Sequence, residues 1–329
     1  MGPKLLYVPR SEAERLLDMA AALRLVEEDF VRSAAGEALL PAGRMMQVRL
    51  PKPGGHHYFF AKMCGLPPQG VVGFRFAAAN SENVRRGLPE SFRYIVLADM
   101  TSGCPLGLVD ETWSWALRTG AEAGVAARFL ARPGSARVGL VGAGLMAEMT
   151  LRALCEVLPV REARVTSRRP QTRQDLAERM GKDLGIDIRA VPTIDEALEG
   201  ADVVVTATTA NAPLVKAHAL PWGCLILSLG TYQELDPGVF RCVTKVVPDD
   251  WEKCKIWGDL AEALRAGTLR EGGIYAELGE IVAGKRPGRE RDDENILAVP
   301  QGMITQDVAL AHFIYERARE KGLGRWLEL

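Results

Sequence analysis

The sequence predicts an α/β protein of two domains, a doubly wound parallel sheet domain and a mostly antiparallel α+β domain. From residue 136 onward, short apolar segments alternate with helical ones, which is typical of a parallel sheet covered on both faces. Before residue 111, short apolar segments are separated by Gly and Pro, which is typical of an antiparallel meander. The 329 residues are enough for two domains of about 150 residues each.

The first domain is expected to begin with helix and continue as sheet. Residues 11–38 have apolar positions at helical spacing and predict a helix or a helix pair. The strands of the meander are expected within residues 47–63, 70–80 and 92–110. Residues 101–107 predict a hairpin turn, and helical spacing returns at residues 111–132.

The second domain is expected to alternate strand and helix. Strands are expected within residues 136–144, 162–169, 188–192, 201–209, 224–230 and 245–250. Helices are expected after the first two of these strands, ending near Leu158 and Leu184. Residues 305–322 form an amphipathic segment that we expect to pack against the first domain. The predicted boundaries are therefore 1–125 with 303–329 for one domain and 126–302 for the other.

Composition narrows the possible partners. Apolar residues make up 47% of the chain, and 41 basic side chains face 42 acidic ones. The net charge of −1 gives no overall field that would attract nucleic acid or an anionic membrane, so we expect neither as a partner. Small molecules and other subunits are the expected partners.

The cysteines and the N-terminus predict a cytoplasmic protein without a metal centre. The six cysteines form no CxxC pair and do not cluster with the four histidines at zinc-site spacing. The N-terminal segment has no apolar core of signal-peptide type. No stretch reaches the ~18 apolar residues of a membrane span.

Residues 138–147, VGLVGAGLMA, carry a GxGxxA fingerprint between a predicted strand and a predicted helix. The first glycine permits a tight turn, the second lets the backbone approach a pyrophosphate, and Ala147 lets the helix pack closely. The amides at the start of the helix would face the phosphates. We therefore expect a Rossmann-type dinucleotide site that includes Gly142, Ala143, Gly144, Leu145 and Met146. The alternative is a βα turn that merely uses glycine.

The end of the second strand predicts NADP(H) rather than NAD(H). An NAD site usually has Asp or Glu there to accept the ribose hydroxyls, whereas this chain has Ser167, Arg168 and Arg169. Arginine can hold a 2′-phosphate bidentately or stack on adenine, and the serine can donate to the same phosphate. The alternative is a solvated basic loop.

Later strand ends offer further cofactor contacts. They lie at the carboxyl edge, where parallel sheets bind ligands. The residues predicted to contact the cofactor are Thr119, Ala207, Thr208, Thr209, Leu229 and Gly230. Threonine at a strand end also commonly caps a turn, which is the alternative for these hydroxyls.

Nine stretches along the chain resemble, in order and spacing, the ornithine cyclodeaminase and μ-crystallin family. They are PAGRMM, GFRFAAANSENVRRGLP, ADMTSGCPLGLVD, RTGAEAGVAARFLAR, VGAGLMA, ADVVVTATT, QELD, ELGEIVAGKRPGR and GMITQDVALA. The resemblance covers nearly the whole chain. It implies a homodimer joined through the first domain, which would serve for substrate binding and dimerisation, a Rossmann domain, and an active site in the cleft between the domains.

The resemblance also implies chemistry at the α-carbon of an amino or imino acid. The predicted enzyme is an NADPH-dependent oxidoreductase that reduces an imine adjacent to a carboxylate. Its substrate would be a cyclic ketimine acid, such as pyrroline- or piperideine-2-carboxylate, or the imine of a 2-oxo acid and an amine, and the reverse reaction is amino-acid dehydrogenation. The alternatives are an ornithine cyclodeaminase and an NADPH-gated protein that binds a small molecule.

Three arginines are expected to hold the substrate carboxylate. Arg44 and Arg118 match the family positions that bind this group, and a planar guanidinium can hold it bidentately. Arg75 stands where the family usually has lysine. Arginine keeps the charge but cannot act as a general base, because its pKa exceeds about 12.

Three further residues are candidates for the site. Tyr232 stands where cyclodeaminases typically carry an aspartate, which disfavours cyclisation and leaves the tyrosine as a proton donor or a pocket wall. Asp307 matches an acidic position near the start of the family's last helix, and its alternative role is to complement a helix dipole. His57 precedes the expected pocket wall and is predicted to orient substrate, the alternative being a polar surface residue.

Overall fold

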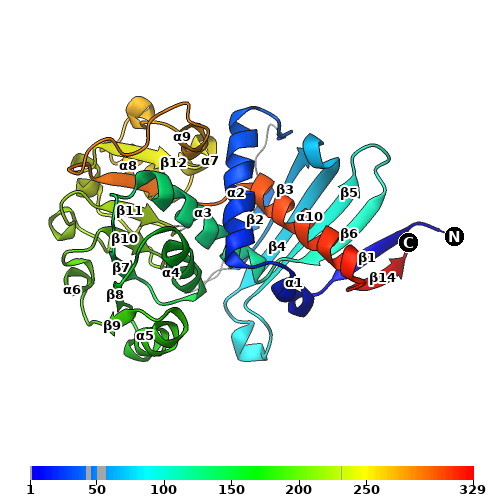
Figure 1. Ribbon diagram of the computed structural model, residues 1–329, viewed down its shortest axis with the longest axis horizontal. Coiled ribbons are helices and arrows are strands. Elements are labelled where there is room, and N and C mark those ends of the chain that lie inside the picture. The colour runs from blue at the N-terminus through cyan, green and yellow to red at the C-terminus, as the bar shows by residue number, and fades with distance from the viewer. Residues whose placement is uncertain (1, 42–45, 50–56, 231) are drawn as a thin grey trace. The chain divides into compact units, whose positions relative to one another are not determined.

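The computed structural model describes residues 2–41, 46–49, 57–230 and 232–329. The chain forms two compact units (Figure 1). Unit 1 comprises Met1–Arg118 and Met303–Leu329, and unit 2 comprises Thr119–Gly302. The chain first passes from one unit to the other inside helix α3 (Ser114–Leu130).

Unit 1 is built on a sheet whose described strands run in the order β14-β1-β6-β5-β4-β3-β2. These strands are β1 (Lys4–Val8), β2 (Met46–Arg49), β3 (His57–Leu66), β4 (Val71–Asn80), β5 (Ser91–Asp99), β6 (Pro105–Asp110) and β14 (Arg325–Glu328). Strands β2 to β6 pair antiparallel, which confirms the expected meander and its turn between β5 and β6. Strands β1 and β14 extend one edge and were not predicted.

One face of this sheet is covered by a helix. On one face lies α10 (Ile304–Lys321), seen in orange-red across the strands in Figure 1. A Cβ at Gly73 would lie 2.3 Å from a methyl carbon of Val308, so glycine lets the helix approach β4. The same helix packs on α2 (Met19–Ala34), and α1 (Arg10–Leu16) adjoins it. The amphipathic segment therefore packs within the first unit, as its sequence predicts.

The opposite face of the sheet exposes apolar side chains. Register pairs such as Met63 with Phe74 place these residues on one face, because directly opposed residues point to the same side of a sheet. Its large exposed members are Met46, Val48, Phe59, Met63, Phe74 and Phe76. We call this surface the open face.

Unit 2 contains a parallel sheet in the order β12-β13-β11-β10-β7-β8-β9. Its described strands are β7 (Arg137–Val141), β8 (Glu162–Thr166), β9 (Asp187–Ala190), β10 (Val203–Thr206), β11 (Leu225–Ser228), β12 (Lys245–Pro248) and β13 (Ile296–Val299). The strand order runs outward from β7 in both directions. The switch point between β7 and β10 is where such sheets bind their ligands.

The helices of unit 2 connect these strands. They include α4 (Leu145–Val157), α5 (Pro170–Leu184), α6 (Ile194–Leu198), α7 (Trp251–Cys254), α8 (Gly258–Arg265) and α9 (Leu278–Val282). The helices expected to end near Leu158 and Leu184 are confirmed, whereas β13 and the short helices were not predicted. No described helix of either unit is long and apolar enough to cross a membrane.

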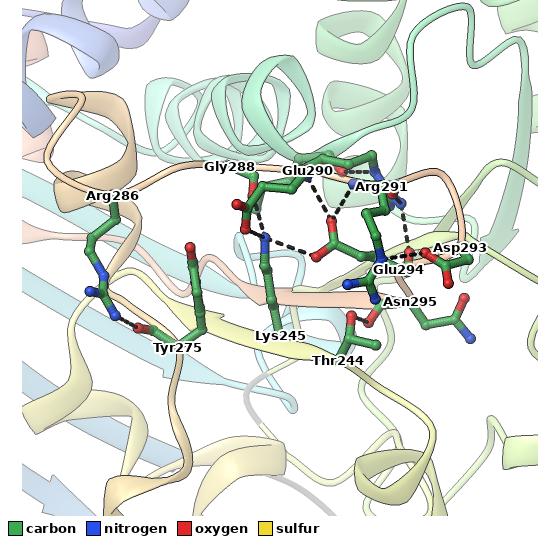
Figure 2. A network of polar contacts seen from close by, with 12 residues as sticks. Thr244, Lys245, Tyr275, Arg286, Gly288, Glu290, Arg291, Asp293, Glu294 and Asn295 are labelled. Carbon is green, nitrogen blue, oxygen red and sulfur yellow. Dashed lines mark hydrogen bonds and ion pairs between the residues drawn. The ribbon is translucent and has the colours of Figure 1, made fainter.

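A buried ion network ties the segment before β13 to β12 (Figure 2). The Lys245 ammonium lies 2.7 Å from the Gly288 carbonyl oxygen, 2.8 Å from Glu290 Oε2 and 2.9 Å from Glu294 Oε1. The other oxygen of Glu294 accepts backbone hydrogen bonds from Glu290 and Arg291. Against the opposing effect of burial, Glu290 and Glu294 raise the pKa of Lys245. We call this arrangement the Lys245 network.

Candidate active site

The turn after β7 has the shape that a pyrophosphate needs. Gly142 has a φ of 120°, and a Cβ at this residue would lie 2.3 Å from the Ala207 carbonyl oxygen, so glycine is required. A Cβ at Gly144 would have no neighbour within 4 Å, which leaves open space before the first turn of α4. Ala147 is buried, consistent with close packing of the helix.

The first turn of α4 supplies the donors for this space. Gly144 is the N-cap residue, and the first amides of a helix have no intrahelical acceptors. These amides and the positive end of the helix dipole suit an anionic group. Ala143, Leu145 and Met146 lie in the same exposed or half-exposed turn. The residues present therefore fit the pyrophosphate of a dinucleotide.

Three arginines gather around the loop after β8. Arg168 and Arg169 are exposed, and the structure gives neither of them an ion pair with a described residue. The Ser167 hydroxyl donates to the Arg169 carbonyl oxygen at 2.9 Å, and Arg173 donates to the Ser167 carbonyl oxygen at 2.7 Å. The Ser167 hydroxyl, predicted to donate to a 2′-phosphate, thus donates within its own loop. Arg173 was not predicted from the sequence.

Two buried carboxyl groups hold the loops after β10 and β11. Glu234 Oε1 accepts the Thr208 amide at 2.6 Å, and Oε2 accepts the Gly230 amide at 2.9 Å. Asp259 accepts the Ser228 hydroxyl at 2.6 Å and the Glu234 amide at 2.8 Å. Burial raises the pKa of Glu234 to about 7 and that of Asp259 to about 6.

These carboxyl groups were missed from the sequence. The sequence feature that could have indicated Glu234 is the acidic residue of QELD, which lies six residues after the end of a buried strand. Because Glu234 bridges the ends of two neighbouring strands, it fixes the shape of the predicted cofactor edge.

The other predicted cofactor residues lie at or near these strand ends. Thr208 Oγ1 accepts the Ala210 amide at 3.0 Å, so this hydroxyl caps a turn. Leu229 donates its amide to the Thr206 carbonyl oxygen at 2.9 Å. Thr209 follows β10 on the same loop, and Thr119 is buried in α3. Tyr232 is half-buried on the loop after β11.

Unit 1 contains a buried cluster of charges under α10, which we call the Arg75 cluster. It consists of Arg75 on β4, Glu111 after β6, Arg118 on α3 and Asp307 on α10. Arg75 Nε donates to Glu111 Oε2 at 2.6 Å, and Arg118 Nε donates to Asp307 Oδ1 at 2.7 Å. An ion pair of 2.9 Å joins Arg75 Nη1 to Asp307 Oδ2. All four residues are no more than 2% exposed.

This cluster is incomplete among the described residues. Arg75 Nη2 and Glu111 Oε1 have no hydrogen-bond partner there, although both atoms are buried. Such orphaned polar groups are rare in folded proteins and are expensive to bury. The cluster therefore offers one free donor and one free acceptor to a ligand.

The electrostatics of the cluster favour an anion. Lys62 is paired in register with Arg75, and Arg93 lies on the next strand, so among the described residues four cations accompany the carboxyl groups of Glu111 and Asp307. Burial together with Arg75 lowers the pKa of Arg93. Although burial opposes ionisation, Arg118 and Arg75 hold the pKa of Asp307 below its ordinary value.

Glu111 behaves differently from Asp307. Burial raises its pKa to about 7, against the opposing pull of Arg75. It is therefore the buried acid of the cluster that exchanges its proton near neutral pH. The sequence analysis did not single it out, and its only signal was an acidic residue between a strand and an apolar helix.

One predicted substrate residue, His57, is not brought to this cluster. Arg44 lies outside the described residues. His57 points to the open face, as shown by its ring contact of 5.5 Å with Phe59, whereas Arg75 lies on the face covered by α10. The structure brings Arg75, Arg118 and Asp307 into contact.

No group of three metal-ligating side chains is found within the part of the chain that the structure describes. Among the described residues, the Arg75 cluster has an unpartnered guanidinium donor, Arg75 Nη2, and the first turn of α4 in unit 2 presents backbone amides. Both kinds of donor bind anions.

Comparison with known proteins finds relatives over almost the whole chain. The model of the ornithine cyclodeaminase/mu-crystallin family matches residues 6–322. Alanine dehydrogenase of Archaeoglobus fulgidus is 31% identical over 325 residues, which covers 97% of both proteins. The Δ1-pyrroline-2-carboxylate reductase of Thermococcus litoralis, solved with NADH and L-proline, is 34% identical with a TM-score of 0.91. That likeness covers 98% of this chain and 99% of the reductase.

A second solved structure is similar to the same extent. An archaeal alanine dehydrogenase dimer with bound NAD is 32% identical, has a TM-score of 0.90 and is covered over 99% of both chains. The likeness thus extends over both units, and it includes proteins named for reduction of a cyclic imine and for dehydrogenation of an amino acid.

Proposed function

The chain belongs to the ornithine cyclodeaminase/mu-crystallin family, and we propose that it is an oxidoreductase that reduces an imine adjacent to a carboxylate. The substrate class is a cyclic ketimine acid, such as pyrroline- or piperideine-2-carboxylate, or the imine of a 2-oxo acid and an amine. The reverse reaction is dehydrogenation of the amino acid. The observation that carries this proposal is a guanidinium donor, Arg75 Nη2, that has no hydrogen-bond partner among the described residues and lies inside a buried cationic cluster.

In this proposal, the Arg75 cluster binds the substrate carboxylate. Arg75 uses Nε for Glu111 and Nη1 for Asp307, which leaves Nη2 for a ligand. Asp307 orients both Arg75 and Arg118, so the guanidinium groups are held in place before substrate binds. A carboxylate fixed in this way sets the orientation of the adjacent C=N bond, and orientation can supply about 7–11 kcal/mol of a barrier reduction.

The cofactor of the proposal is a nicotinamide dinucleotide bound by unit 2, which supplies the hydride. Gly142, Gly144 and the first turn of α4 would hold its pyrophosphate, and the Glu234 bridge keeps the two neighbouring loops in shape. The two solved relatives hold NADH or NAD.

For this chain we propose NADP(H) as the preferred form. Arg168 and Arg169 are exposed beside the expected ribose position, and their guanidinium groups can hold a 2′-phosphate. The loop that carries them is braced by Arg173 through the Ser167 carbonyl oxygen.

We also propose that the protein is a homodimer joined through the open face of unit 1. The side chains of Met46, Val48 and Met63 are 71%, 59% and 46% exposed, and contiguous apolar surface of this kind marks an interaction site. Sedimentation should show a dimer that Phe74→Arg/Phe76→Arg converts to a monomer. Val84→Arg is the control, because Val84 is exposed away from this sheet, and it should leave the dimer intact.

The activity is tested by following oxidation of NADPH and NADH in parallel with purified protein. The panel runs from pyrroline- and piperideine-2-carboxylate to pyruvate with ammonia or methylamine. Oxidation that depends on one of these substrates supports the proposal. Tight NADPH binding without turnover of any member contradicts it and favours a binding protein.

The coenzyme preference is tested with Arg168→Ala/Arg169→Ala. The affinity for NADPH should fall by about tenfold or more, since a charge-assisted hydrogen bond contributes roughly 1.5–3 kcal/mol, while the affinity for NADH stays near that of the parent. Arg161→Ala is the matched control, an exposed arginine at the other end of β8. Equal losses of affinity for NADPH and NADH would contradict the proposed preference for NADP(H).

A further inference from the structure

In the Arg75 cluster, only one of the two carboxyl oxygens of Glu111 has a partner among the described residues. Its Oε2 accepts from Arg75 Nε at 2.6 Å, whereas its Oε1 has no partner among the described residues. The residue is 2% exposed. An oxygen left unpaired at this depth indicates that a ligand group completes its hydrogen bonding.

The free oxygen lies next to the donor that the proposed carboxylate would occupy. Glu111 Oε1 and Arg75 Nη2 belong to side chains joined by a hydrogen bond, so a ligand that reaches one lies near the other. An imino acid carries its nitrogen one carbon away from its carboxylate. A neighbouring donor and acceptor pair therefore matches the two polar groups of such a substrate.

We propose that Glu111 is a catalytic residue: its Oε1 binds the substrate nitrogen and gives that nitrogen a proton when the imine is reduced. This inference rests on the proposed function. The proton leaves the Glu111 carboxyl group as the N–H bond forms, the imine carbon accepts hydride from the nicotinamide coenzyme, which is oxidised, and water reprotonates the carboxylate. In the reverse direction, the Glu111 carboxylate takes a proton from the amine.

The surroundings of Glu111 suit this exchange. Arg75 on β4, Arg93 on β5, Arg118 on α3 and Asp307 on α10 are the charged groups that act on it, and Lys62 on β3 acts on Asp307. Burial favours the neutral acid, and Arg75 stabilises the carboxylate that remains after proton transfer. The resulting pKa of about 7 is near the value at which a general acid works best around neutral pH.

The arginines of the cluster cannot take this role. A guanidinium does not lose its proton near neutrality, since its pKa exceeds about 12. Asp307 is held ionised by Arg118 and Arg75, so it has no proton to give. Within the Arg75 cluster, Glu111 is the group that combines an available proton with a free oxygen.

The test compares Glu111→Gln with the parent enzyme in imine reduction and in binding of L-proline and L-alanine with oxidised coenzyme. Glutamine keeps the size and can still accept from Arg75, but it carries no titrating proton. We expect kcat to fall by about 10²–10⁴-fold, as for loss of a general acid. Amino-acid affinity of the parent should rise with pH through an inflection near 7, and that inflection should be absent from the variant.

A second variant separates catalysis from structure. Glu111→Asp retains the acid and the counter-charge for Arg75, so it should keep the pH inflection and recover part of kcat. Asp29→Asn is the matched control, because Asp29 is another buried acid of unit 1 whose pKa burial raises to about 7. It should leave the inflection in place.

Two results would overturn the inference. One is a Glu111→Gln enzyme with the parental inflection and kcat within about threefold of the parent, well short of the loss expected for a general acid. The other is loss of the inflection in Asp29→Asn. If the parent oxidises coenzyme with none of the imines, the proposed function fails, and the pH dependence of amino-acid binding still decides the role of Glu111.

Discussion

The Arg75 cluster and the Lys245 network both bury charged side chains, but among the described residues only the Lys245 network is complete. Lys245 has three acceptors within 2.9 Å, and both oxygens of Glu294 are used. The Arg75 cluster leaves a donor and an acceptor without partners among the described residues. Each unsatisfied buried group costs roughly 1–3 kcal/mol, so stability alone would not select this arrangement. We therefore expect the Lys245 network to stabilise the fold, and we propose that the Arg75 cluster holds a ligand.

The pKa values of Glu294 in the Lys245 network and Glu111 in the Arg75 cluster are shifted in opposite directions. Although burial opposes ionisation, two backbone amides and Lys245 lower the pKa of Glu294, whereas burial raises that of Glu111. With a pKa of about 7, the Glu111 carboxyl group can change its protonation state near neutral pH.

The largest effect is expected from Arg118→Met in the Arg75 cluster. Loss of one partner from a buried charge pair at a binding site costs about 2–5 kcal/mol, so kcat/KM should fall by roughly 10²–10³-fold. Because Asp307 keeps its ion pair with Arg75, the melting temperature should fall less than in Lys245→Met. Steady-state kinetics and a thermal melt check both statements. A large loss of stability with unchanged kcat/KM would make this cluster structural, like the Lys245 network.

The opposite pattern is expected from Lys245→Met. Removing one partner of a buried ion network costs roughly 3–5 kcal/mol of unfolding free energy, while kcat should be unchanged well below the melting temperature. Lys255→Met is the matched control, since Lys255 pairs with Glu252 at the surface and its loss should leave the free energy of unfolding nearly unchanged. Denaturant titrations that show the same loss of unfolding free energy for both variants would contradict a special stabilising role of Lys245.

A smaller effect is expected in the pH dependence of stability. Burial raises the pKa of Asp29 from 3.8 to about 7, so the folded state keeps a proton that the unfolded state has released. The free energy of unfolding therefore falls as pH rises through that window, by roughly 3 kcal/mol between about pH 5 and 8 from this group. Asp29→Asn should flatten the profile by that amount. An unchanged profile would show that Asp29 titrates normally.

The sequence predicted the strands and helices that carry periodic apolar patterns. Strands β7, β8, β10 and β11 and helices α4 and α5 lie where expected, because each is a short apolar run or a helical pattern next to turn residues. Strand β13, four apolar residues after a charged stretch, was missed. Strands β1 and β14 were missed because their pairing joins opposite ends of the sequence.

The site was predicted unevenly for a related reason. Arg75, Arg118 and Asp307 were chosen by family position, and the structure brings them together. Glu111 and Glu234 were not chosen, because burial of a single acid depends on tertiary contacts that leave no local pattern. His57 was chosen because it precedes the expected pocket wall, but strand alternation directs it to the open face.

The placement of α10 has a consequence for synthesis on the ribosome. Unit 2 is one uninterrupted segment, so it can fold while the chain is still growing. Unit 1 lacks α10 and β14 until the last residues emerge, and only then does Asp307 reach Arg75 and Arg118. Until α10 packs on the sheet, Arg75 and Arg118 lack the carboxylate of Asp307 as a partner. The nucleotide-binding unit should therefore mature before the cluster proposed to hold the substrate.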